Sequence, residues 1–199
     1  VIGGAGKDTL TATITGLTVD DDDLKIQDVE NINLTTSGAN VIDATGITGT
    51  STVLSVSDNK QTISNLDLAN VTLGLGLTAA SADSASEIDV TAADATGSAD
   101  TLKVKLENSE AATNSIIDAS AIETLDLEVI HVSNNATLDL TTFEGDNIAI
   151  KSKTGVTGSG TVALGTVHKN TESVNSTYAG GVTVSFGNSL LASTFTGEG

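Results

Sequence analysis

Hydrophobic and polar residues alternate one by one along most of the chain. This period of two is typical of β-strands that bury one face, and the Gly, Asn, Asp, Ser and Thr clusters between the runs are typical of turns. The pattern predicts an all-β chain, in which only residues 78–87, with their Ala-rich start, favour a turn or two of helix. The clearest runs cover residues 10–14, 32–34, 53–56, 66–68, 71–77, 88–90, 102–106, 125–129, 138–140, 148–150, 162–164 and 182–186.

Two sequence motifs recur at nearly the same spacing. Asp8-Thr9-Leu10 returns as Asp100-Thr101-Leu102, and Val29–Leu34 returns as Ile122–Leu127. Agreement between two well-separated motifs indicates a duplicated unit. We therefore expect two related β modules. Residues 1–95 form the first, and residues 96–199 form the second, with closing strands that lead into a further calcium repeat.

A shorter pattern marks candidate corners between strands. An aliphatic residue, then Asp or Asn, then two small residues occur at 42–45, 117–120 and 174–177. Short polar side chains that bond to the backbone two residues on favour tight corners. Such corners fit a β-solenoid with irregular rungs, related to the parallel β-helix and β-roll, and they also fit tandem β-sandwich modules. The solenoid is the first interpretation and the sandwich pair is the alternative.

The stretch Val29–Leu34 predicts how one strand sits in the fold. After a bend, Val29, Ile32 and Leu34 are expected to point inward. The Asn residues beside them either form ladders with equivalent positions on neighbouring rungs or are the polar side of an ordinary half-buried strand.

A nine-residue window near the start, Gly3–Thr11, matches G-G-x-G-x-D-x-U-x at every specified position. This is the calcium-loading half-turn of the parallel β-roll. Its glycines allow left-handed backbone angles that turn loop carbonyls inward, its Asp supplies a hard oxygen, and calcium takes six to eight such ligands. A plain glycine-rich turn before a strand is the alternative. The candidate calcium ligands of this window are Gly3, Gly4, Ala5, Gly6 and Asp8.

Four consecutive carboxylates follow at Asp20, Asp21, Asp22 and Asp23. Side chains of like charge at that density repel one another unless a cation or solvent intervenes. We interpret them as a second candidate calcium site at a module corner, with backbone carbonyls completing the shell. A solvated acidic loop is the alternative.

Composition narrows the function. The chain has 199 residues and a formal charge of −18, with 26 acidic residues against 8 basic ones, all Lys. This excess argues against nucleic acid and anionic membranes as partners, and no long apolar segment predicts membrane insertion. With no Cys, neither disulfides nor thiolate metal sites can form. Two isolated His, no G-x-S-x-G motif and no Arg favour a non-enzymatic chain.

These residues resemble the surface-layer proteins of bacteria that carry calcium-binding nonapeptide repeats, and the related repeat-rich exoproteins and adhesins. The resemblance rests on Gly3–Thr11, on Val29–Leu34 with its echo at Ile122–Leu127, and on the corner pattern. It also includes the tail at 176–198, whose Gly-rich strand and ending look like the lead-in to another calcium loop. From it we expect an insert between calcium-repeat stretches of a longer protein, an expectation that the absence of Met supports.

The resemblance implies a secreted, calcium-dependent structural protein that self-assembles into a lattice on the bacterial cell surface. It implies export in one step as an unfolded chain that folds when it meets external calcium. Other copies of the protein are the expected partners, and cell-surface polysaccharide is bound, if at all, through parts outside this chain. A module of an adhesin is the alternative function, and a polysaccharide-active β-helix enzyme is a third, which the scarcity of aromatic and basic residues disfavours.

Overall fold

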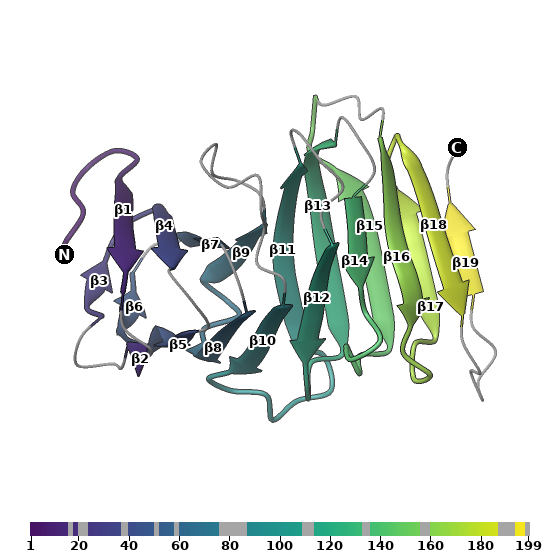
Figure 1. Ribbon diagram of the computed structural model, residues 1–199, viewed down its shortest axis with the longest axis horizontal. Helices are drawn as coiled ribbons and strands as arrows, with labels where there is room; N and C mark the ends of the chain where they lie inside the picture. The colour runs from purple at the N-terminus through teal and green to yellow at the C-terminus, as the bar shows by residue number, and fades with distance from the viewer. Residues whose placement is uncertain are drawn as a thin grey trace.

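A computed structural model describes residues 1–15, 18–19, 24–36, 40–49, 52–57, 60–75, 87–108, 114–132, 136–155, 160–186 and 194–197. Successive strands wind into a β-solenoid, in which each turn of the chain lies on the turn before it (Figure 1). All paired strands in these residues run parallel, for example β1 (Thr9–Ile14) with β4 (Asn31–Thr36). The predicted all-β solenoid is confirmed. Tandem sandwiches are excluded for this part of the chain, because they pair their strands antiparallel.

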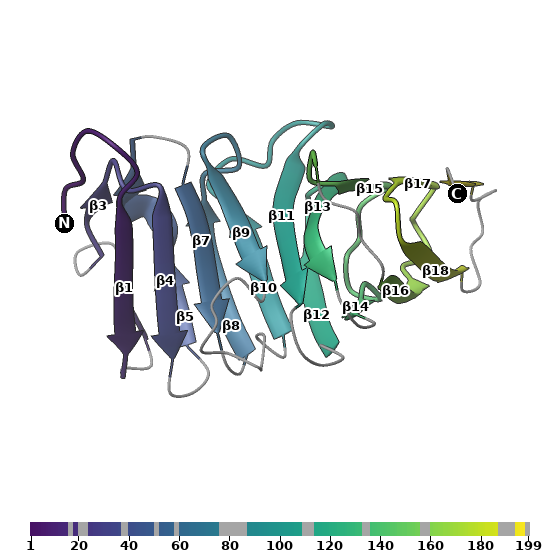
Figure 2. The same cartoon turned by 90° about the horizontal axis from the view of Figure 1, so that it is seen from above.

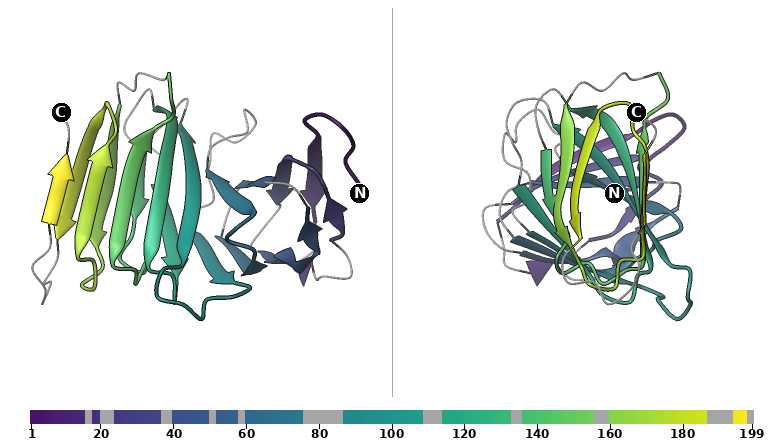
Figure 3. Two further views of the ribbon diagram at one scale, coloured as in Figure 1. Left: turned by 180° about the vertical axis from the view of Figure 1, so that it is seen from behind. Right: turned by 90° about the vertical axis from the view of Figure 1, so that its right-hand side faces the viewer.

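Two facing sheets form the walls of the solenoid (Figures 2 and 3). In the described residues, the larger sheet has nine strands in the order β1, β4, β7 (Thr52–Ser57), β9 (Val71–Leu75), β11 (Thr101–Asn108), β13 (Thr124–Val132), β15 (Asn147–Ser152), β17 (Ser173–Thr177) and β19 (Thr194–Gly197). The chain therefore returns to this sheet once per turn.

The second sheet has eight strands in the described residues. Its order is β18 (Gly181–Phe186), β16 (Thr161–Val167), β14 (Ala136–Asp139), β12 (Asn114–Ala119), β10 (Glu87–Ala92), β8 (Lys60–Leu66), β5 (Asn40–Asp43) and β2 (Thr18–Val19). At the N-terminal end a small third side is formed by β3 (Ile26–Gln27) and β6 (Ile47–Thr48).

The rungs of the solenoid are uneven in length. Thr9 pairs with Asn31, and Asn31 pairs with Val53, a spacing of 22 residues each time. The spacing falls to 19 residues between Thr52 and Val71, and it rises to 31 residues between Leu73 and Val104. Among the described strand pairs the register shifts only within β8–β10, β11–β13 and β16–β18, so the connections between strands absorb most of the differences in length.

Aliphatic side chains from both sheets fill the interior. Val29, Ile32 and Leu34 are buried, as expected, with exposed fractions of 2%, 0% and 2%. Their echoes Ile122 and Leu125 are buried equally, at 2% and 0%. Parallel stacking places each inward residue over the inward residue of the next rung, so the core is a continuous column of Val, Ile, Leu and Ala with few aromatic rings.

Both sheets run without a break past residue 95. In the larger sheet β9 pairs with β11, and in the smaller sheet β10 pairs with both β8 and β12. The strands on either side of the proposed boundary thus share hydrogen bonds and a core. The division into modules at 1–95 and 96–199 stays a prediction about units of the chain.

The corner patterns had mixed outcomes. At 42–45 the strand β5 ends at Asp43, and the 3₁₀ turn η1 (Ala44–Gly46) follows. At 117–120 the strand β12 ends at Ala119 and a turn follows. The third pattern, at 174–177, was wrong as a corner, because it lies within β17. The helix expected at 78–87 falls largely outside the described residues, and Glu87 begins β10.

At two turns, an aromatic ring packs against the glycine that follows it two positions later. The rings of Phe143 and Tyr178 are almost fully buried. The Phe143 ring lies against Gly145, and the Tyr178 ring lies against Gly180. A Cβ atom at Gly145 would lie 2.5 Å from the carbonyl oxygen of Ile122 and 2.5 Å from the Phe143 ring. Both glycines therefore make room for a ring where small aliphatic side chains would leave a void.

The substitution Gly145→Ala is expected to destabilise the protein by about 1–3 kcal/mol, because the added methyl group overpacks the corner. Gly97→Ala is the matched control, since the nearest atom its Cβ would meet is Asp100 Oδ2 at 3.4 Å, an ordinary contact. Urea unfolding followed by circular dichroism measures both. Equal stability of the two variants would contradict this account of the aromatic corners.

Candidate metal site at the first corner

The nonapeptide loop links the third side of the solenoid to the first strand of the large sheet. Ile2 bridges to Gln27, and the Gly3 amide donates to the Gln27 carbonyl at 2.8 Å. A Cβ atom at Gly3 would lie 1.7 Å from the Asp28 carbonyl oxygen, so only glycine fits there. Gly6 has φ +130°, a conformation that favours glycine. Two of the motif's glycines are thus required by the backbone itself.

Asp8 fastens this loop to the next rung. Its carboxylate oxygen Oδ2 accepts a hydrogen bond from the Gly4 amide at 2.7 Å, while its own amide donates to Glu30 Oε2 at 2.8 Å. Its carbonyl accepts from the Asn31 amide at 3.0 Å, which begins the pairing of β1 with β4. One residue therefore closes the loop and sets the register of the strand that follows.

The same corner is built a second time at Asp100. Its carboxylate accepts from the Gly97 amide at 3.3 Å, its amide donates to Glu123 Oε2 at 2.8 Å, and its carbonyl accepts from the Thr124 amide at 3.0 Å. The sequence repeat is therefore a repeated hydrogen-bonded corner. Sequence reasoning found both motifs but missed that Asp8 joins Glu30 and Asp100 joins Glu123, although the spacings of 22 and 23 residues were available as a signal.

Asp8 provides the single carboxylate of this loop. In the part of the chain that the structure describes, no group of three or more His, Cys, Asp or Glu side chains is placed to hold a metal ion. Asp8 uses one carboxylate oxygen for the Gly4 amide. Gly4, Ala5 and Gly6 are exposed and contribute only backbone atoms. A shell of six to eight oxygens would have to draw mainly on carbonyls or on chain beyond this loop.

The second candidate site, Asp20, Asp21, Asp22 and Asp23, lies outside the described residues. Its assignment therefore stays a prediction.

A row of Asp-led turns follows the strands of the smaller sheet. Asp43 Oδ1 accepts from the Thr45 amide at 2.9 Å, and Asp94 Oδ1 accepts from the Thr96 amide at 3.1 Å. Asp139 makes the same bond to the Thr141 amide at 2.9 Å. Asn65, at φ +55°, donates from Nδ2 to Asp43 Oδ2 at 3.0 Å and so ties one rung to the next.

A hollow of about 380 Å³ opens beside the Asp94 turn, and Asp67, Asp94 and Asp100 are among its lining residues. Each carboxylate is bound within its own turn. Asp67 accepts from the Ala69 amide at 3.0 Å and from Asn70 Nδ2 at 2.8 Å. The carboxylates thus serve to shape the turns around the hollow.

Hydrogen bonds to these carboxylates favour their charged form. The Thr45 side chain and amide lower the pKa of Asp43, and the Thr96 side chain and amide lower the pKa of Asp94. The Asn70 side chain lowers the pKa of Asp67 against the opposing effect of burial. The turns are therefore strongest when these acids are ionised.

Comparison with known proteins identifies no relative: no protein-family model, curated protein or solved structure matches the chain. The resemblance to calcium-binding surface-layer proteins thus rests on the motifs alone. Within the described residues, no helix has the length and apolar character needed to cross a membrane.

The substitution Glu123→Ala is expected to lower the free energy of unfolding by about 1–3 kcal/mol, because it leaves the Asp100 amide without its charged acceptor. Glu144→Ala removes an exposed carboxylate and is expected to change stability by less than about 0.5 kcal/mol. Urea titrations in EGTA and in calcium should give the same loss for Glu123→Ala. Stability equal to that of Glu144→Ala would refute the role of this corner.

Acid should weaken the Asp-led turns. Because the folded pKa of Asp43 and of Asp94 lies below the unfolded value of about 3.9, their stabilisation is present above that pH and is lost as pH falls through the folded pKa. The double variant Asp43→Asn/Asp94→Asn is therefore expected to lose less stability between about pH 5 and pH 2.5 than the wild type.

The matched control is Glu144→Gln/Glu172→Gln, which removes the same number of charges from exposed positions. It should keep the acid sensitivity of the wild type. Thermal melting across the pH series distinguishes the two double variants, and identical pH profiles would show that the turns do not carry this part of the stability.

Proposed function

We propose that this chain is a structural segment of a secreted, calcium-dependent bacterial surface-layer protein whose copies assemble into a lattice on the cell surface. The observation that carries the proposal is the position of the nonapeptide Gly3–Thr11. It forms the turn that leads into the first strand of a parallel β-solenoid, which is the structural context in which this motif loads calcium.

The fold suits a mechanical role. Successive rungs are joined by parallel strand pairs in both sheets, so the larger sheet forms a continuous ladder from β1 to β19 (Figure 1). The hydrophobic column inside and the Asp-led turns at the corners resist shear between rungs. The hollow beside Asp67 and Asp94 is lined by side chains that are bound within turns, which supports a scaffold role over a catalytic one.

The charge of the chain supports dependence on a divalent cation. A formal charge of −18 on 199 residues makes the folded chain repel itself. Calcium bound at acidic corners reduces that repulsion and adds its binding free energy to folding. The Asp100 corner repeats the hydrogen bonds of the Asp8 corner without the full nonapeptide, so the calcium response should belong to the first corner and to the acidic run at Asp20–Asp23.

Saturating calcium is expected to raise the melting temperature over that measured in EGTA by about 5–10 °C, the shift that 2–3 kcal/mol of binding produces in a domain of this size. Asp8→Asn should reduce this calcium response, because it removes the only carboxylate of the nonapeptide. Differential scanning calorimetry at increasing calcium, with magnesium as the comparison ion, measures the effect.

Asp100→Asn is the matched control, since it alters the same hydrogen bonds in a corner that lacks the nonapeptide. It should lower stability and leave the calcium shift intact. Negative-stain images of the chain in calcium should show ordered assemblies that EGTA disperses. A melting temperature that does not respond to calcium, or equal responses of the two variants, would contradict the proposal.

A further inference from the structure

Among the side chains that the structure describes, the two outer faces of the solenoid differ in charge. On the smaller sheet, the charged side chains that point outward from the strands and are described are Asp43, Asp89, Asp118 and Asp139, with no Lys among them. On the larger sheet, the corresponding set is Lys103, Lys105, Lys151, Glu107, Asp126 and Glu128. In a chain with 26 acidic and 8 basic residues, the described outer face of the larger sheet therefore carries no net charge.

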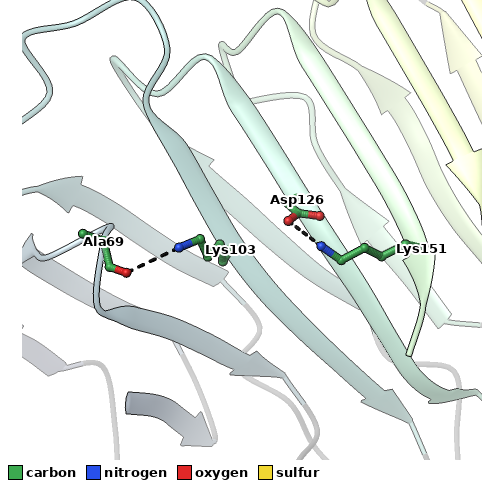
Figure 4. A network of polar contacts seen from close by, with 4 residues as sticks. All are labelled: Ala69, Lys103, Asp126 and Lys151. Carbon is green, nitrogen blue, oxygen red and sulfur yellow. Dashed lines mark hydrogen bonds and ion pairs between the residues drawn. The ribbon is translucent and has the colours of Figure 1, made fainter. Parts of the chain in front are cut away.

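The charges on this neutral face are sorted by strand. Lys103 and Lys105 lie on β11, and they stand in register with Asp126 and Glu128 on β13. We call these four residues the charge patch. Beside it, Lys151 on β15 forms an ion pair with Asp126, with Nζ 2.6 Å from Oδ2 (Figure 4). A positive column thus runs alongside a negative column on the surface of one sheet.

Small uncharged side chains cover the rest of this face. Its outward residues on the flanking strands include Thr9, Thr11, Asn31, Asn33, Thr72, Ala149, Asn175 and Thr196. None of these side chains projects far from the sheet, so a second surface can approach it closely.

We propose that two copies of this chain pair face to face through the charge patch. The arrangement deepens the proposed lattice function, on which it rests, by naming the surface through which copies meet. A two-fold axis parallel to the strands, between β11 and β13, places Lys103 of each copy opposite Asp126 of the other and Lys105 opposite Glu128. The contact is self-complementary, as a two-fold interface requires.

The geometry leaves room for this contact. The same axis sets Lys151 of each copy over Gly74 on β9 of the other, one outward position along the strand from Thr72. A hollow of about 130 Å³ lies there between Thr72 and the charge patch. Lys103 Nζ donates to the Ala69 carbonyl at 3.4 Å (Figure 4), and its ammonium group has two further donors for a partner. Five strands about 20 Å long and spaced about 4.8 Å apart offer about 500 Å² per copy, near the lower limit for a specific interface.

A charge exchange tests the pairing. Sedimentation velocity of the wild-type chain at low salt should show a monomer–dimer equilibrium that weakens as sodium chloride is raised. Lys103→Glu/Lys105→Glu and Asp126→Lys/Glu128→Lys should each weaken dimerisation at least tenfold, because like charges then face each other. An equimolar mixture of the two variants should restore it, since every contact in the mixed dimer again joins opposite charges.

The control Thr137→Glu/Thr183→Glu adds two negative charges to the outer face of the smaller sheet and should leave dimerisation unchanged. Circular dichroism and melting temperature verify that each variant is folded, and Lys103→Ala/Lys105→Ala provides a milder change that should also weaken the dimer. A wild-type chain that stays monomeric to about 100 μM would overturn the pairing. So would double variants that dimerise as well as the wild type, or a mixture that fails to recover.

The two proposals fail in different ways. Assembly that responds to calcium but not to the charge exchange would leave the lattice function standing and refute the face-to-face pair. Pairing that follows the charge exchange but does not respond to calcium would support the face-to-face pair and refute the calcium-dependent lattice function.

Discussion

Parallel in-register stacking of successive turns is the constraint on which the structure depends. Each strand must present the same side to the interior as the strand before it, because a shift of one residue would turn its aliphatic side chains to solvent. The strands therefore alternate almost without exception, and the connections between them absorb the variation in rung length. The low aromatic content follows from the same geometry, since the narrow interior between two sheets accepts Val, Ile, Leu and Ala more readily than rings.

Many of the acidic side chains lie at the corners between strands, where they hydrogen-bond to the backbone. Asp8 and Asp100 each join a turn to the next rung through a glutamate and a strand amide. Asp43 and Asp94 close turns after the strands of the smaller sheet. Much of the negative charge thus has a defined structural use, because carboxylates accept the backbone amides that a sharp corner leaves unpaired. In the described residues the wide face of the larger sheet keeps its charges balanced, and this separation lets one acidic chain fold and still offer a surface to another copy.

The sequence predicted the fold class and most of the strands, because period-two alternation reports burial directly. It also placed Val29, Ile32 and Leu34 in the core. It did not reveal the rung length, since a repeat near 92 residues hid a shorter and uneven one of about 22, and side chains such as Asp8 and Glu30 meet only when the turns stack. The Phe143–Gly145 and Tyr178–Gly180 corners were missed for a related reason. Each glycine is required because a backbone carbonyl of the preceding rung lies against it, and this contact exists only once the turns stack. The calcium assignments stay predictions, with Asp8 built into a hydrogen-bonded corner and Asp20–Asp23 outside the described residues.

The central claim is a single uninterrupted stack, and spin-label distances test it most directly, because a chain without cysteine accepts label pairs cleanly. Labels at Thr9 paired in turn with labels at Thr101, Asn147 and Ser173 follow the outward face of the larger sheet from β1 to β17. At about 4.8 Å per strand, the separations should rise steadily through about 19, 29 and 34 Å. Distances that do not increase with the number of strands between the labels, or a Thr9–Ser173 separation shorter than Thr9–Thr101, would contradict the stack.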